Sequence, residues 1–264
     1  MPYKRQISAV DDPNLDNLDD LPQPVVSFGQ DLAKGQVLPF HSHRRAQLVY
    51  ASQGVMAVNT RRASYVIPPQ RAVWMPGGVE HRIEARNAVK MRTLYIARSE
   101  IENLPHDVCV LQITPLLREL IVEAVAAGID YAPHSPLARI MSVILDQIRT
   151  QPVAQSLKLQ LPTDPRLLRI VQALVDNPAD PRELTDWANE VGASIRTLVR
   201  LFPAQTGMTF REWRQQRRLL RALELLATGV SVTNVALEVG YENTSAFIAM
   251  FRRCLCTTPT RYLP

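Results

Sequence analysis

Residues 184–192 read LTDWANEVG, and residues 232–240 read VTNVALEVG. The two stretches lie 48 positions apart and share Thr, Ala, Glu, Val and Gly at matching places. Each combines a short amphipathic helix with a glycine, Gly192 or Gly240, that can adopt the left-handed backbone of a tight turn. A second helix with its own apolar residues follows each glycine, which is typical of a helix-turn-helix unit. Two copies in one chain predict two such units rather than a plain helical bundle.

A long amphipathic segment joins the two units. We expect the first unit, the linker helix and the second unit at about 182–203, about 209–227 and about 231–253. Ser194 is a natural N-cap for the second helix of the first unit, and Asn243 or Thr244 can cap its counterpart. The residues just after these caps are therefore expected to form the exposed first turns of two recognition helices.

With these features, residues 163–264 resemble the DNA-binding domain of the AraC/XylS family of bacterial transcription regulators. The resemblance is carried by a C-terminal signature: Val235, Ala236, Gly240, Tyr241, Phe247, Phe251, Thr258, Pro259 and Tyr262. The sequence departs from the family at Pro203, where a basic residue usually follows the first recognition helix, and at Cys256, where Gly is usual. Pro203 is expected to remove one phosphate contact, and Cys256 must accept a helix-ending conformation that favours Gly.

The resemblance implies that both recognition helices enter successive major grooves on one face of the DNA, about 34–36 Å apart. The residues expected at the DNA are Ser194, Ile195, Arg196, Thr197 and Arg200 in the first unit, and Asn243, Thr244, Ser245 and Ala249 in the second. Arg196 and Arg200 lie four positions apart on one helical face, and Arg commonly binds guanine O6 and N7. The alternative for either arginine is a contact to phosphate alone.

Positive charge is concentrated in the same region. Residues 194–221 contain seven arginines against one acidic residue, Glu212, in a chain of formal net charge +5. Arg252, Arg253 and some of the arginines in 211–221 are expected to clamp DNA phosphates or to brace the linker helix. An arginine-rich helix face that is merely solvated is the alternative to nucleic-acid binding.

The N-terminal half predicts a different architecture. Short runs rich in Val, Ile, Tyr and Trp alternate with turn residues from residue 24 to about residue 97, which indicates a sandwich or barrel of jelly-roll type. The spacing of two motifs resembles the cupin superfamily: Gly35, His41, His43, Gln47 and Gly54 in the first, and Pro76, Gly78 and His81 in the second. In cupin metalloenzymes three such histidines and a carboxylate hold a divalent ion, and here Gln47 stands at the carboxylate position.

Three interpretations of this histidine set remain open. His41, His43 and His81 can hold a divalent transition metal, with Gln47 as a poor fourth ligand. They can instead form the polar lining of a small-molecule effector pocket. They can also be a remnant that makes only structural hydrogen bonds.

The sequence therefore predicts an α+β chain of two domains, a cupin-like β-barrel with flanking helices followed by an all-α domain. The expected segments are an acidic arm (1–23), an effector domain (24–110), a helical packing and dimerisation segment (111–150), a linker (151–163) and the DNA-binding domain (164–264). The last helix of the helical segment carries an aliphatic stripe that we expect to serve also as a dimer contact: Leu137, Ile140, Met141, Ile144, Leu145 and Ile148.

The predicted function is that of a homodimeric, sequence-specific regulator of transcription that binds double-stranded operator DNA and responds to a small-molecule effector. The family resemblance favours activation over repression and adds RNA polymerase as a partner. No cofactor is required and no enzymatic activity is expected. Without a signal peptide or a run of about 18 apolar residues, we expect a cytoplasmic protein with no membrane partner. The alternatives are a cupin metalloenzyme with a helical appendage, or a DNA-binding protein whose β domain serves only dimerisation.

Overall fold

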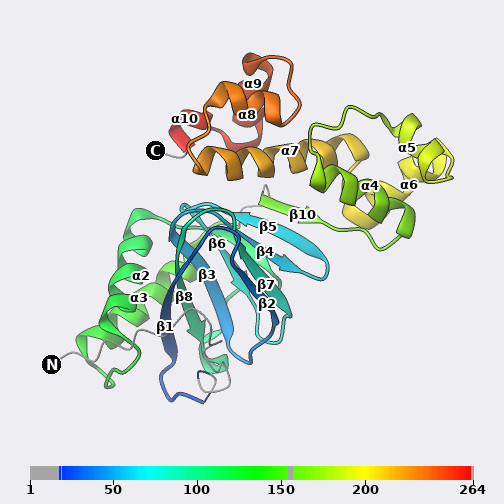
Figure 1. Ribbon diagram of the computed structural model, residues 1–264. Helices are drawn as coiled ribbons and strands as arrows, with labels where there is room; N and C mark the ends of the chain where they lie inside the picture. The colour runs from blue at the N-terminus through cyan, green and yellow to red at the C-terminus, as the bar shows by residue number, and fades with distance from the viewer. Residues whose placement is uncertain (1–17, 19, 154–156, 263–264) are drawn as a thin grey trace.

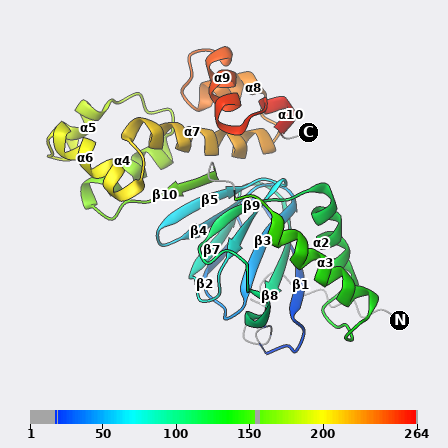
Figure 2. The ribbon, with the colours of Figure 1, turned by 180° about the vertical axis from the view of Figure 1, so that it is seen from behind.

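The computed structural model describes residues 18, 20–153 and 157–262, and it confirms an α+β chain with an N-terminal β-sandwich and a C-terminal helical half (Figures 1 and 2). Two five-stranded sheets face each other, and the pairings between their strands are antiparallel. The first sheet contains, in order, β1 (Val25–Leu32), β8 (Val89–Ile96), β3 (Ala46–Gln53), β6 (Arg71–Met75) and β9 (Cys109–Gln112). The second contains β10 (Lys158–Gln160), β5 (Ala63–Ile67), β4 (Met56–Thr60), β7 (His81–Ala85) and β2 (Val37–His41).

Strand alternation determines which side chains reach the sandwich interior. In β7, His81, Ile83 and Ala85 are buried, whereas Arg82 and Glu84 between them are half-exposed. Successive side chains of a strand point to opposite faces, so this period of two assigns the histidine to the interior.

Two helices cover the outer face of the first sheet. They are α2 (Pro115–Ala127) and α3 (Pro136–Thr150), and a short 3-10 helix, η1 (Arg98–Glu100), precedes them. Met141, Ile144, Leu145 and Ile148 of α3 are buried in one cluster with sheet residues that include Trp74. The prediction that this stripe also serves as a dimer contact is therefore wrong for these four residues, because the chain's own sheet covers them.

The predicted linker, 151–163, contains a strand. Leu157 and Leu159 are 0% and 2% exposed, and β10 pairs with β5 so that Gln160 lies opposite Ala63. The alternation of Leu with polar residues at 157–161 is a strand pattern, although the composition of the segment resembles that of a linker. The first sheet also extends past residue 110, because β9 ends at Gln112.

The N-terminal segment is partly described. The acidic residues Asp11, Asp12, Asp16 and Asp19 of the predicted arm lie outside the described residues. Asp20 forms an ion pair with Arg44, and the buried Arg45 donates to the backbone carbonyls of Leu21 and Gln23. The last residues of the predicted arm are thus attached to the sandwich.

The helical half consists of α4 (Pro165–Asp176), α5 (Leu184–Glu190), α6 (Ile195–Thr206), α7 (Phe210–Ala227), α8 (Val232–Glu238), α9 (Thr244–Leu255) and α10 (Pro259–Tyr262). In Figure 1, α7 crosses above β5 and β10. One continuous apolar core includes Tyr65 and Leu159 of the second sheet together with Trp213 and Leu220 of α7. The indole Nε1 of Trp213 also donates to the carbonyl of Gln160 at 2.8 Å. Among the described residues, no helix combines the length and the apolarity needed to cross a membrane.

Candidate nucleic-acid interface

Two helix-turn-helix units lie at opposite ends of α7 (Figures 1 and 2). The first unit is α5 with α6, and the second is α8 with α9. The buried Ala188 and Ala236 lie in the first helices of the units, as the repeat predicts. A single helix therefore carries both units and separates them.

The glycines of the two turns both have positive φ, but their surroundings differ. Gly192 has φ 65° and Gly240 has φ 79°. A Cβ built on Gly192 would meet no atom within 4 Å, whereas one on Gly240 would lie 2.9 Å from the Cα of Ala179 and 2.9 Å from a guanidinium nitrogen of Arg218. The second turn thus packs directly against the loop between α4 and α5, which precedes the first unit.

The first recognition helix, α6, begins as predicted. The Ser194 hydroxyl accepts from the amide of Thr197 at 3.1 Å, and Leu198 and Phe202 are fully buried against the rest of the domain. The exposed side chains on its first turns are Ile195, Arg196, Val199 and Arg200, while Thr197 is half-buried.

Two features of α6 differ from the sequence analysis. Val199, which is 56% exposed, was not among the predicted DNA contacts, although its position four residues after Ile195 places both on one face. Pro203 does not follow the helix but lies inside it, and α6 continues to Thr206 before ending at Gly207 with φ 71°. Proline keeps a helical φ but cannot donate to the carbonyl four residues earlier, so α6 passes through Pro203 without that hydrogen bond and ends at the left-handed Gly207.

The second recognition helix, α9, is capped by Asn243, whose Oδ1 accepts from the amide of Ala246 at 2.8 Å. Phe247 and Phe251 are fully buried, as expected. The remaining predicted contacts of this helix are exposed, namely Ser245, Ala249, Arg252 and Arg253, except that Thr244 is half-buried. Its last residue is followed by Cys256 with φ 56°, which is the left-handed conformation expected there.

Several arginines of α7 brace the fold instead of facing solvent. Arg217 is 8% exposed and donates to the carbonyl of Val175 at 2.9 Å, and burial lowers its pKa. Arg218 donates to the carbonyl of Pro178 at 2.9 Å, and Arg221 pairs with the buried Glu224 at 3.0 Å. Of the two roles predicted for 211–221, these side chains fulfil the bracing one.

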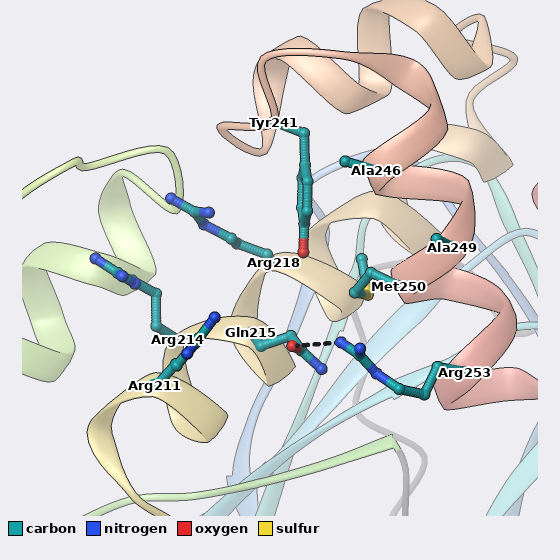
Figure 3. Close-up of a pocket in the computed structure, with 9 residues that line it drawn as sticks. All are labelled: Arg211, Arg214, Gln215, Arg218, Tyr241, Ala246, Ala249, Met250 and Arg253. Atoms are coloured by element: carbon teal, nitrogen blue, oxygen red, sulfur yellow. Dashed lines mark hydrogen bonds between the residues drawn. The ribbon is translucent and has the colours of Figure 1, made fainter.

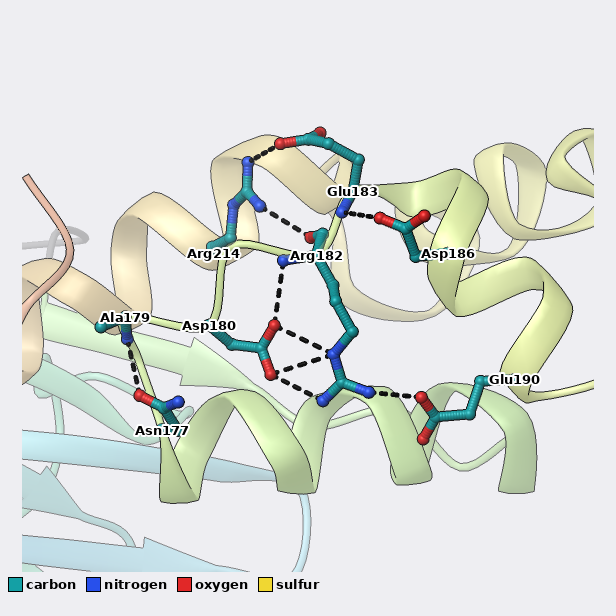
Figure 4. Close-up of polar contacts among 8 residues, drawn as sticks. All are labelled: Asn177, Ala179, Asp180, Arg182, Glu183, Asp186, Glu190 and Arg214. Atoms are coloured by element: carbon teal, nitrogen blue, oxygen red, sulfur yellow. Dashed lines mark hydrogen bonds and ion pairs between the residues drawn. The ribbon is translucent and has the colours of Figure 1, made fainter.

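A second set of polar contacts holds the first unit to α7 (Figure 4). Arg182 forms a two-pronged ion pair with the buried Asp180, contacts Glu190, and lies 3.6 Å above the ring centroid of Trp187. The hydrogen bonds from Arg182 lower the pKa of Asp180. Arg214 of α7 then donates to the carbonyl of Arg182 at 3.0 Å. These contacts fix the loop that leads into α5.

The three histidines of the cupin-like motifs meet at one end of the sandwich. His41 and His81 are paired across β2 and β7, and their ring centroids lie 4.4 Å apart. His43 is 5.3 Å from His81 by the same measure. Each Nδ1 atom lies within hydrogen-bond distance of a backbone carbonyl: Pro39 for His41 at 2.8 Å, Arg45 for His43 at 2.6 Å, and Val79 for His81 at 2.9 Å.

Gln47 changes what this cluster can bind. Its Oε1 lies 3.0 Å from Nε2 of His43, and its amide nitrogen donates to the Thr93 hydroxyl at 2.9 Å. The ring nitrogen that would face a metal is therefore in contact with the amide. Across the described parts of the chain, no group of three or more His, Cys, Asp or Glu side chains is arranged to hold a metal ion. The arrangement does not fit the cupin metal set.

His81 itself is fully buried, and its Nε2 has no hydrogen-bond partner among the described residues. The pKa of His81 is lowered to about 4, mainly by burial and also by the neighbouring His41 and His43, against the opposing hydrogen bond to Val79. The ring is neutral near pH 7, and with the Nδ1 proton directed to Val79 its Nε2 is an acceptor.

Two family models match the chain. One describes an AraC-like ligand binding domain and covers residues 27–176, and the other describes a helix-turn-helix domain and covers residues 187–264.

Known proteins show similarity over one half or both halves of the chain. It is 36% identical over 225 residues to the HTH-type transcriptional regulator NimR of Escherichia coli (strain K12), which covers 85% of this chain and 82% of that protein. It is 37% identical over 123 residues to the HTH-type transcriptional regulator RipA of Corynebacterium glutamicum, covering 47% of this chain and 35% of that one. The solved structure of ToxT from Vibrio cholerae O395 is 14% identical, with a TM-score of 0.38 over 90% of this chain and 96% of that one.

The two turn glycines provide a matched pair of substitutions. Gly192→Ala should cost about 1–2 kcal/mol of unfolding free energy, because only the left-handed backbone opposes the new Cβ. Gly240→Ala should cost about 1–3 kcal/mol more, because the Cβ also meets the backbone of Ala179. Urea unfolding of both variants measures the difference. Equal losses would show that the second turn does not pack against the α4–α5 loop in solution.

The buried His81 should make stability depend on pH. Its folded pKa of about 4 lies below the ordinary value of 6.5, so the unfolded chain binds the proton first as the pH falls. The contribution of His81 to stability is complete above the unfolded pKa. As the pH falls from about 7 to about 5, its titration should lower the unfolding free energy by about 2 kcal/mol. Urea unfolding at both pH values, compared with His81→Leu and the exposed control His106→Leu, checks this. A pH dependence in His81→Leu as steep as in the wild type would contradict the assignment.

Proposed function

Because the chain belongs to the AraC family of transcription regulators, we propose that α6 and α9 read successive major grooves of one operator and that a small molecule at the β-sandwich controls this reading. As a member of the family, the protein is a DNA-binding regulator of transcription. The observation that supports the proposal most is the placement of two recognition helices at the two ends of α7, each with an exposed first half.

The exposed side chains of α6 and α9 differ in how well they can distinguish DNA bases. On α6, Arg196 and Arg200 can each donate two hydrogen bonds to a guanine edge, and Ile195 and Val199 can contact thymine methyl groups. On α9, Ser245 and Ala249 offer only a hydroxyl and a methyl. Most of the base discrimination is therefore assigned to the half-site under α6.

The effector is proposed to bind where the histidines meet. A cavity of about 460 Å³ is lined by Arg44, Arg45, Gly77, Gly78, Ala97 and Arg98. It adjoins the histidine cluster, because the Gly78 amide donates to the carbonyl of His43 at 2.8 Å. Three arginines in its lining favour an organic anion. His81 lies outside this lining and is fully buried, so a ligand that also donates to its Nε2 has to displace the residues between them. This proposal takes the histidines as polar pocket lining in preference to a metal site or a structural remnant.

The strand that begins at His81 leads directly to the DNA-binding half. Nε of Arg86, just after β7, lies 3.3 Å from a carboxylate oxygen of Glu224 on α7. The side-chain amide of Asn87 donates to the carbonyl of Ala227 at 3.1 Å. A ligand that prefers one position of β7 can therefore bias the position of α7, by as much as its affinities for the two positions differ.

The other partners follow from the family and from exposed apolar residues. Leu116 on α2 and Val143 on α3 are 56% and 42% exposed on the outer layer of the sandwich, and we assign homodimerisation to these helices. We assign activation, with RNA polymerase as a partner, in the cytoplasm where the chromosome lies; the similar protein RhaR of Mannheimia succiniciproducens is a transcriptional activator by name. The rival metalloenzyme lacks support, because Gln47 replaces the carboxylate and contacts His43.

Arg196→Ala tests the readout. Against a duplex selected from a random library by the full chain, it should lose about 1–3 kcal/mol of binding free energy and relax discrimination at one base position. Arg252→Ala is the comparison variant, because loss of a phosphate contact should weaken binding equally for all base substitutions. Competition binding across single-base variants measures both. A uniform loss for Arg196→Ala would assign that arginine to phosphate.

A thermal-shift screen of small organic acids on the full chain tests the effector site. A hit should raise the melting temperature of the wild type, leave His81→Leu unchanged, and alter DNA affinity in a gel-shift assay. That alteration should shrink in Arg86→Gln but persist in Arg82→Gln, whose guanidinium lies 3.7 Å from Glu84 and over the ring of Phe40, both in the sandwich. Binding without any effect on DNA affinity would favour a sandwich that serves only assembly. About one metal ion per chain by elemental analysis would favour the metal site.

A further inference from the structure

A cavity of about 280 Å³ lies between α7 and α9, inside the DNA-binding half (Figure 3). None of its nine lining residues is acidic, and four are arginines, namely Arg211, Arg214, Arg218 and Arg253. Ala246, Ala249 and Met250 of α9 form the opposite wall. We call this cavity the basic cleft.

The helical period brings three of these arginines to one face of α7. Positions 211, 214 and 218 follow the spacing i, i+3 and i+7, so their side chains share a stripe. Arg214 and Arg218 are held at the stripe by the carbonyls of Arg182 and Pro178. From α9, Arg253 donates to Oε1 of Gln215 at 3.0 Å. The cations are thus positioned by polar contacts, mostly to neutral groups.

The positive charge in the basic cleft is poorly compensated within the chain. Glu183 pairs with Arg214 at 2.9 Å, and it is largely exposed at the edge of the cluster. Arg218 is disfavoured as a cation, since burial and then the charge of Arg214 lower its pKa. Arg211 lies in the first turn of an 18-residue helix, where the helix dipole opposes a positive charge. No described residue forms a hydrogen bond or ion pair with its guanidinium. An anion in the cleft would relieve all three costs.

We propose that the basic cleft binds a backbone phosphate of the DNA whose major groove α9 reads. Ala249 is both a lining residue of the cleft and a predicted contact of the recognition helix, so the cleft borders the reading surface. A helix in a major groove about 12 Å wide has a row of phosphates on each side, within reach of cations beside it. The inference rests on the proposed role of α9 and adds the residues that hold the strand next to it.

Arg211→Gln and Arg253→Gln test the site, because both side chains are exposed and their removal leaves the bracing contacts of Arg214 and Arg218 in place. Arg62→Gln, an exposed arginine of the sandwich, is the control for loss of one charge. Each cleft variant should bind the selected duplex more weakly, to the same degree for all base substitutions. The ratio of the wild-type to the variant binding constant should shrink about 3.5-fold between about 50 and about 200 mM salt, as expected for one lost phosphate contact. A salt slope equal to that of Arg62→Gln would overturn the proposal.

Single methylphosphonate linkages placed along the selected duplex locate the contact. One neutral linkage beside the α9 half-site should weaken wild-type binding more than that of Arg211→Gln, whereas a linkage elsewhere should weaken both equally. Inorganic phosphate forms the other arm of the test. If it raises the melting temperature of the wild type but not of Arg211→Gln, while no linkage shows coupling, the cleft takes a free anion and the DNA assignment is overturned. Failure of the wild type to select any duplex would instead reject the proposed reading itself.

Discussion

Two opposite charges buried on α7 constrain how the rest of the helical half is placed. Arg217 and Glu224 are 8% and 4% exposed, and charges taken out of water are costly unless they are paired and hydrogen-bonded. Arg217 donates to the carbonyl of Val175 at the end of α4, while its Nε has no hydrogen-bond partner among the described residues. Glu224 pairs with Arg221 and with Arg86 from the sandwich. The linker helix is therefore held against α4 and the β-sandwich by contacts of these two buried charges.

The features of the fold that sequence could predict are local ones. A glycine with positive φ, a Ser or Asn cap and an apolar period of helical spacing each depend on a few neighbouring residues, so the two helix-turn-helix units could be placed from the repeat. The element that packs against a given helix face depends instead on distant parts of the chain. The aliphatic stripe of α3 reads equally well as an interface or as a cover for a sheet, and Met141 and Ile144 turn out to cover the sheet. The three-residue β10 was missed because the linker-like composition of its segment outweighed a short alternation of Leu with polar residues, which pairs with β5.

In the candidate sites, too, some features could be predicted from the sequence and others depend on the three-dimensional surroundings. The spacing of His41, His43 and His81 predicted that they meet, and the register of β2 with β7 brings the first and the last side by side. The prediction that Gln47 weakens a metal site is consistent with its position against Nε2 of His43. The orphaned Nε2 of His81 could not be predicted, because it depends on what surrounds the ring in three dimensions. Likewise, no sequence pattern distinguishes an arginine that reaches a backbone carbonyl of another helix from one that faces the DNA.

The arginines of α7 can be sorted by a simple physical test. A guanidinium with a carbonyl or carboxylate inside the chain, as for Arg217 and Arg221, already has its anionic or polar partner and contributes to the fold. One that lines a cavity without acidic residues, as Arg211 does, still needs a partner. This division matches the recognition helices. Where α9 offers bases little more than methyl and hydroxyl groups, affinity has to come from the backbone beside it. On the proposed reading, Arg211 thus supplies affinity next to the recognition helix that offers fewer groups to the bases.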